Sequence, residues 1–153
     1  MRIHLIAVGD RMPGWVQQGY LDYAKRMPAE CQLRLIEVAA GRRGKNVDLA
    51  RLQRDESTRL RNAIPKGAWV VAMEVTGKSW STEHLATELG GWLQQGRDVA
   101  LLVGGPDGLD AAARAAAQQQ WSLSPLTLPH PLVRIVVAEQ LYRAWNILQN
   151  HPY

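Results

Sequence analysis

The chain has 153 residues, of which 46% are apolar and 21% charged, and this length and composition predict one folded domain, residues 1–153, with a single core. No apolar stretch reaches the roughly 18 residues that a membrane-spanning helix needs, which excludes a membrane protein. The net charge is +4, and residues 1–66 carry 13 basic and 7 acidic side chains, which indicates a polyanionic partner such as RNA or, alternatively, a solvated basic surface.

Apolar runs alternate with amphipathic segments along the whole chain. We predict a strand at 3–8, a helix at 13–27, a strand at 33–39, a helix at 48–63, a strand at 68–75, a helix at 81–95, a strand at 99–103, a helix at 110–120, a strand at 122–128 and a long helix at 131–150. Asp48, Ser81 or Thr82, and Asp110 stand where helices begin, and Gly96 stands where one ends. This alternation predicts an α/β fold in which helices flank a mostly parallel sheet.

The amino-terminal run at 3–8 has no small-residue cleavage site after it, so we interpret it as a buried strand and not as a secretion signal. The single cysteine, Cys31, excludes an intramolecular disulfide and a thiolate metal cluster. Both observations favour a cytoplasmic protein.

Glycine and polar residues gather after the predicted strands, which is where parallel sheets bind ligands. Gly104-Gly105-Pro106-Asp107-Gly108 follows a buried strand and permits close approach of a ligand to the backbone, although a tight turn without a ligand is equally consistent with it. Its spacing matches neither the dinucleotide fingerprint nor the P-loop. Residues 122–129 combine apolar and hydroxyl side chains, which suits an adenine slot or an ordinary buried strand.

The last predicted helix is apolar on most of its circumference, which predicts a homodimer interface. Glu139 and Arg143 recur at helical spacing on one polar stripe, which is either a solvated face or the wall of an active site. His130 lies between two prolines, where an imidazole can hydrogen-bond or transfer a proton, although a lone histidine is more often structural. We expect Arg134 to lie near it and to contact a ligand.

Several long motifs resemble the RlmH family of ribosomal RNA methyltransferases. They are Val103–Gly108, Leu126–Arg134, Ala138–Trp145 and Asn150–Tyr153, with Ala7–Gly9, Met12–Val16 and Gly41–Asn46 in the first half. The resemblance covers essentially the whole chain, although the family usually continues for a few residues past the position of Tyr153.

The resemblance implies a homodimeric SPOUT-class enzyme with a carboxy-terminal trefoil knot. It implies that S-adenosylmethionine is the cofactor, that no metal is needed, and that N3 of a pseudouridine is methylated in the 23S ribosomal RNA of assembled ribosomes. The implied cofactor contacts are Met73, Gly104, Gly105, Leu123, Ser124, Pro125, Leu126, Thr127 and Leu128.

Methylation of an imide nitrogen requires loss of its proton, so a base or a cation that stabilises the resulting anion would help. We predict Glu139 as the base and Arg134 or Arg143 as the anion stabiliser. For RNA binding we predict Arg42, Arg43, Lys45, His130, His151 and Tyr153. The alternative function is a non-enzymatic RNA-binding module for ribosome assembly.

Overall fold

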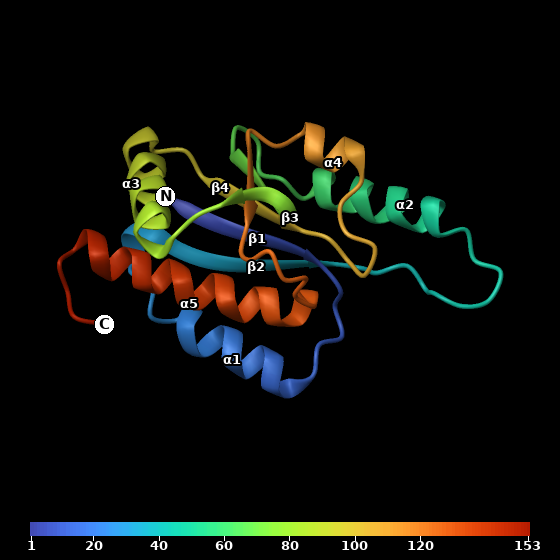
Figure 1. Ribbon diagram of the computed structural model, residues 1–153, viewed down its shortest axis with the longest axis horizontal. Coiled ribbons are helices and arrows are strands. Elements are labelled where there is room, and N and C mark those ends of the chain that lie inside the picture. Colours follow the sequence, from blue (N-terminus) through green and yellow to red (C-terminus); the bar gives the residue numbers. More distant parts are fainter.

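A computed structural model describes all residues from 1 to 153 and contains one five-stranded sheet (Figure 1). The strands are β1 (Arg2–Val8), β2 (Gln32–Val38), β3 (Trp69–Ser79), β4 (Val99–Val103) and β5 (Gln119–Ser122). They lie in the order β2-β1-β4-β3-β5, and every neighbouring pair is parallel. The predicted α/β class and parallel sheet are therefore confirmed.

Helices cover both faces of this sheet (Figure 1). They are α1 (Gly14–Ala24), α2 (Leu49–Asn62), α3 (Thr82–Gln95), α4 (Ala111–Ala115) and α5 (His130–Leu148), with a short 3-10 turn η1 (Ala29–Cys31). On one face α5 lies between α1 and α3, and α2 and α4 lie on the other. None of these helices is long and apolar enough to cross a membrane.

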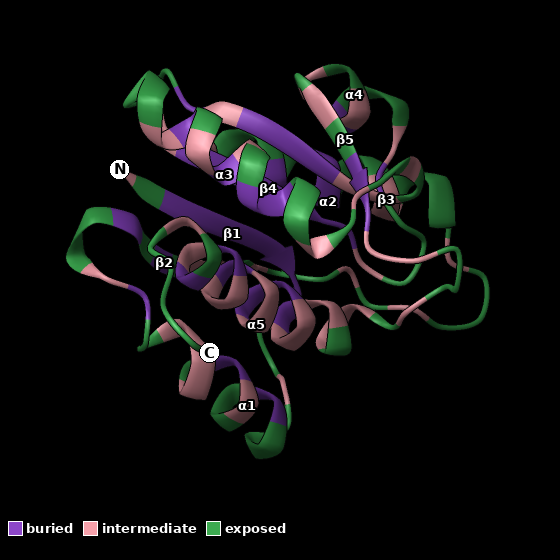
Figure 2. Ribbon diagram, turned by 60° about the vertical axis from the view of Figure 1, so that its left-hand side comes forward, coloured by how far each residue is buried: buried purple, intermediate pink, exposed green.

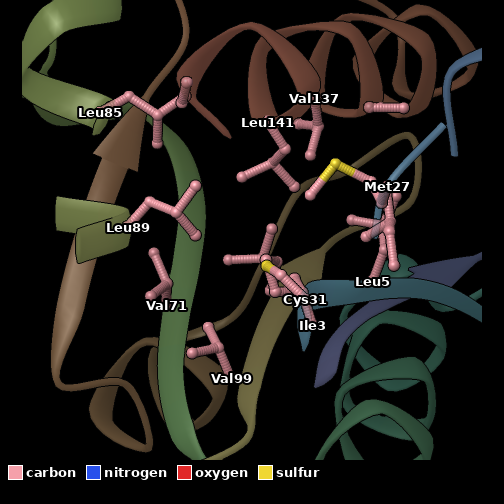
Figure 3. Packing of buried hydrophobic residues seen from close by; sticks show 14 of the residues in the cluster. Ile3, Leu5, Met27, Cys31, Val71, Leu85, Leu89, Val99, Val137 and Leu141 are labelled. Carbon is pink, nitrogen blue, oxygen red and sulfur yellow. The ribbon is translucent and has the colours of Figure 1, made fainter. Parts of the chain in front are cut away.

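Alternation along the central strands separates two apolar cores. Ile3 and Leu5 of β1 face the larger core, whereas Ile6 and Val8 face the smaller one under α2 and α4. Figure 2 shows β1 almost entirely buried, as expected for a central strand covered on both faces. In the larger core, side chains from α3 and α5 pack over the sheet (Figure 3).

The predicted helix boundaries hold where a cap is encoded locally. The Asp48 carboxylate accepts from the backbone N–H of Arg51 at 3.1 Å, and the Ser81 hydroxyl accepts from that of His84 at 3.0 Å. Gly96 ends α3 with a left-handed φ of 70°.

Two predicted elements near the end of the sheet were wrong. The alanine-rich helix stops at Ala115 and not near residue 120, because the next residues join the sheet, where the backbone N–H of Gln118 donates to the Val70 carbonyl at 2.8 Å. Strand pairing here outweighs the helix propensity of alanine.

The fifth strand is Gln119–Ser122, whereas the sequence predicted 122–128. The Ser122 hydroxyl donates to the Ser124 carbonyl, and the Ser124 hydroxyl accepts from the backbone N–H of Leu126, both at 2.9 Å. Such local bonds compete with strand pairing and turn the chain into an irregular segment. That segment, and not a strand, borders the site described below.

Candidate functional site

A cavity of about 660 Å³ lies at the carboxyl ends of β4 and β5, beside the middle of β3. Its volume is within the range of about 300–1,000 Å³ that is usual for small-molecule sites. Its wall consists of Met73, Glu74, Val75, Thr76, Val103, Gly104, Gly105, Pro106, Gly108, Leu109, Trp121, Leu123, Ser124, Leu126, Thr127, Leu128, Pro129, His130, Pro131 and Val133. The strand-end position is where the sequence predicted a binding site.

Most of the predicted cofactor contacts share this one cavity. Eight of the nine line it, namely Met73, Gly104, Gly105, Leu123, Ser124, Leu126, Thr127 and Leu128, whereas Pro125 does not. Sequence reasoning did not single out Trp121 or Val133, which also line it. An apolar residue near the end of a strand or helix carries no separate signal that it borders a cavity.

The conformation of the loop that contains Gly104 leaves no room for a side chain at this position. A Cβ built on Gly104 would lie 2.5 Å from the carbonyl carbon of Gly108 and 2.9 Å from the backbone nitrogen of Leu109. The backbone N–H of Gly108 donates to the Gly105 carbonyl at 3.0 Å, and Gly108 has a φ of 74°. The loop thus closes on itself, and the close approach that needs glycine here is between two parts of the chain.

A bulge in β3 forms the opposite wall. Met73 and Lys78 both pair with Trp121 of β5, so residues 74–77 arch away from the sheet between them. Thr76 in this arch lines the cavity and also a more polar hollow of about 610 Å³ on its far side. The indole of Trp80, which borders the second hollow, stacks on that of Trp121, with ring centroids 5.1 Å apart.

Three polar atoms in the cavity wall are buried without a hydrogen-bond partner in the protein: Glu74 Oε2, Trp121 Nε1 and His130 Nδ1. Glu74 is held from the other side by Arg114, whose Nη1 lies 3.4 Å from Glu74 Oε1. Unsatisfied buried groups are costly, so atoms of this kind mark positions where a polar ligand can bind.

Glu74 and His130 are the only titratable residues in this wall. Burial lowers the pKa of His130, and the positive charges of Arg134 and Arg43 lower it further, while Glu56 opposes them. The imidazole is therefore neutral at neutral pH and can accept a hydrogen bond or a proton.

Arg134, predicted to stabilise an anion at the reacting centre, is buried and bonded within its own chain. Its side chain is 1% exposed, and it does not line the cavity. Its guanidinium donates to Glu37 Oε2 at 2.6 Å and to the Gly9 carbonyl at 2.7 Å. Gly9 directly follows β1 and Glu37 lies in β2, so these bonds connect the first turns of α5 to the sheet.

Glu139 and Arg143 form an ion pair on α5, with Arg143 Nη2 2.6 Å from Glu139 Oε2. Burial would raise the pKa of Glu139, but contacts with Tyr153, Arg143 and Gln140 outweigh it and lower the pKa. The chain end folds back along α5, so that the Arg143 guanidinium lies 4.0 Å from the Tyr153 ring centroid. Neither charged residue lines the cavity of its own chain, and His151 and Tyr153 are exposed.

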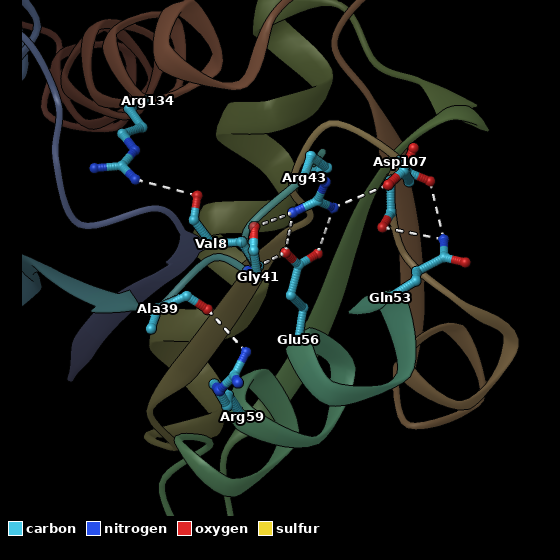
Figure 4. A network of polar contacts seen from close by, with 10 residues as sticks. Val8, Ala39, Gly41, Arg43, Gln53, Glu56, Arg59, Asp107 and Arg134 are labelled. Carbon is cyan, nitrogen blue, oxygen red and sulfur yellow. Dashed lines mark hydrogen bonds and ion pairs between the residues drawn. The ribbon is translucent and has the colours of Figure 1, made fainter. Parts of the chain in front are cut away.

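The basic loop, residues 41–47, does not present its three cations equally. Arg42 and Lys45 are exposed, as RNA contacts must be. Arg43 instead points inward, where it pairs with Glu56 of α2 and with Asp107 (Figure 4). Its charge is matched by these two carboxylates, whereas the exposed Arg42 and Lys45 have no such partner in the structure, and RNA contact by Arg43 stays a prediction. A buried glutamate in a charged helix gave no sequence signal for this pairing.

Comparison with known proteins shows to which class of enzyme the chain belongs. A family model described as "Predicted SPOUT methyltransferase" matches residues 1–153. The chain that forms this parallel sheet thus belongs to the SPOUT methyltransferases.

Two relatives show which family of SPOUT methyltransferases the chain belongs to. Proteins from Thioalkalivibrio sulfidiphilus and Hahella chejuensis, both named ribosomal RNA large subunit methyltransferase H, are 59% and 61% identical to it over 100% of this chain and 98% of theirs. The chain therefore belongs to the RlmH family.

Solved structures of lower identity share the fold. A methylase family protein from Haemophilus influenzae Rd KW20 has a TM-score of 0.59 at 12% identity, covering 97% of this chain and 68% of its own. TrmJ from Z. mobilis ZM4 has a TM-score of 0.57 at 19% identity, covering 98% and 71%. A Legionella pneumophila protein solved in complex with the bound cofactor SAM has a TM-score of 0.51 at 12% identity, covering 94% and 66%.

Proposed function

We propose that the protein transfers a methyl group from S-adenosylmethionine to N3 of a pseudouridine in the 23S ribosomal RNA of assembled ribosomes. The observation that carries this proposal is the cavity at the strand ends, whose wall includes eight of the nine residues expected to contact the cofactor. The names of the relatives support ribosomal RNA of the large subunit as the substrate. The Legionella pneumophila complex supports the cofactor.

The residues of the cavity fit this cofactor. Its apolar side chains, such as Leu123 and Leu128, suit the flat adenine ring. The unpartnered Glu74 Oε2 can accept from a ribose hydroxyl or an ammonium group. Its negative charge also complements a cationic ligand.

When bound, S-adenosylmethionine supplies a methyl group that is already activated by its sulfonium sulfur. The protein's task is then to place the acceptor nitrogen in line with that methyl group and to receive the proton from N3. His130, neutral and within the cavity wall, is one candidate for that proton, although burial and the nearby Arg134 and Arg43 lower its pKa and so weaken it as a base. We retain Glu139 as a second candidate base, since its lowered pKa keeps it ionised, although a low pKa also makes it a weak base.

Glu139 and Arg143 belong to the proposed homodimer surface. Both lie on α5, where Leu132 and Ile147 leave 39% and 41% of their surface exposed in the single chain. A second copy that covers these apolar side chains would place the ion pair at the interface between the two copies. A homodimer, a carboxy-terminal knot and a cytoplasmic location are part of the proposal.

The test uses ribosomes from cells that lack this modification. The purified protein and methyl-labelled S-adenosylmethionine are incubated with these ribosomes, and the nucleosides of the large-subunit RNA are analysed by mass spectrometry. We expect one labelled N3-methylpseudouridine per ribosome and none with modified ribosomes. Ribosome binding without label transfer would instead support the alternative, a non-enzymatic assembly module.

A further inference from the structure

The basic loop and the cavity loop, residues 104–108, meet through one guanidinium. Arg43 Nη2 donates to Glu56 Oε1 and to Asp107 Oδ2, each at 2.9 Å (Figure 4). Arg43 and Asp107 are 64 residues apart in sequence, and each belongs to a loop that follows a strand end. This contact therefore joins the surface expected to bind RNA to a wall of the cofactor cavity.

Glu56 of α2 holds Arg43 and the basic loop in place. Its side chain is 3% exposed, and its carboxylate accepts from the backbone N–H of Gly41 at 2.8 Å and from both terminal nitrogens of Arg43. A carboxylate this buried is tolerated only when it is paired and hydrogen-bonded. Hydrogen bonding to Glu56 in turn raises the pKa of Arg43 above its usual range, so the guanidinium stays charged.

The cavity loop rests on the same assembly. A Cβ built on Gly105 would lie 3.2 Å from Glu56 Oε1, so the backbone of this cavity-lining residue packs directly over the carboxylate. From α2, Gln53 Nε2 donates to the Asp107 carbonyl at 2.9 Å. Displacement of Arg43 would thus remove the side-chain attachment of the cavity loop through Asp107 and leave only its main-chain attachment to Gln53.

We propose that Arg43, seated on Glu56, is a positioning residue that couples RNA binding at the basic loop to cofactor binding in the cavity. A ligand packed against Pro106 and Gly108 restrains Asp107 between them. Asp107 then restrains Arg43, and Arg43 restrains the loop that carries the exposed Arg42 and Lys45. Ordering of the two loops is then needed only once, so each ligand favours the other to the same extent. This inference rests on the proposed function.

The experiment measures ribosome binding with and without saturating S-adenosylhomocysteine, using unmodified ribosomes and filter binding. For the unaltered chain we expect S-adenosylhomocysteine to tighten binding roughly fivefold or more, the lower end of typical coupling between sites. Asp107→Asn removes the charge that pairs with Arg43, leaving at most a weaker neutral hydrogen bond from a side chain that is 35% exposed, and should reduce the effect to less than twofold. Asp55→Asn removes the same charge from an exposed position on α2 and should keep the full effect.

Arg43→Lys separates positioning from simple charge. A lysine keeps the positive charge, but its single ammonium group lacks the planar fork that reaches two carboxylates together. We expect this variant to lose the tightening as Asp107→Asn does, whereas a role limited to phosphate contact predicts that the tightening is kept. Equal tightening in all four chains, or none in an unaltered chain that methylates ribosomes, overturns the coupling alone. An unaltered chain that neither methylates ribosomes nor binds S-adenosylhomocysteine overturns the proposed function.

Discussion

Substitution of Gly104 by alanine should deform the cavity loop from within. The added methyl would lie 2.5 Å from the carbonyl carbon of Gly108, whereas ordinary contacts begin near 3.4 Å, so about 0.9 Å of backbone movement is required. Because the obstacle is backbone and not a flexible side chain, the loop must open. Overpacking of this kind costs about 1–3 kcal/mol. For a domain of this length each kcal/mol lowers Tm by roughly 2–4 °C.

The assay combines differential scanning calorimetry with titration of S-adenosylhomocysteine. We expect Gly104→Ala to lower Tm and to weaken S-adenosylhomocysteine binding at least tenfold, the equivalent of about 1.4 kcal/mol. The matched control is Gly91→Ala in α3, where a Cβ meets nothing within 4 Å and alanine should stabilise the helix by about 0.5–1 kcal/mol. A Gly104→Ala protein with unaltered Tm and affinity would refute the reasoning.

Three further predictions follow from the site and its surroundings. Arg42→Ala and Lys45→Ala should each reduce the magnitude of the salt slope of ribosome binding by roughly 0.7–0.9, and an unchanged slope would show that these cations are only solvated. Burial lowers the pKa of His130 in the folded chain, so below about pH 6.5 the unfolded chain binds a proton at this histidine more readily than the folded chain does, and the free energy of unfolding falls as the pH is lowered. In urea unfolding, His130→Gln should show a smaller fall in this free energy between neutral and acid pH than the unaltered chain. An equal fall in the two proteins would contradict this assignment. Leu132→Glu and Ile147→Glu should convert a dimer into a folded monomer by light scattering, whereas a monomeric unaltered chain would disprove the interface.

Local chemistry made much of the fold predictable. Caps such as Ser81 and stops such as Gly96 act within one helical turn, so the sequence places them correctly. Alternation along β1 likewise reports burial directly, because each side chain faces one core or the other. Parallel sheets bind ligands at the carboxyl ends of their strands, and this general rule predicted the position of the cavity.

The features that the sequence did not predict depend on contacts between residues that are far apart in the chain. Gln118 and Gln119 extend an alanine-rich helical pattern, yet they join the sheet because β3 offers partners at its edge. Arg43 and Arg134 looked like free cations because their partners, Glu56 and Glu37, are distant in sequence. Spacing along a chain shows which charges are present, but not which of them the fold neutralises.

Titration of the unaltered protein with S-adenosylhomocysteine tests most directly whether the cavity at the strand ends binds S-adenosylmethionine, as we propose. Isothermal titration calorimetry should give saturable binding that Gly104→Ala weakens and Gly91→Ala leaves unchanged. Absence of binding heat at several temperatures, with the protein shown to be folded by its thermal transition, would contradict this proposal.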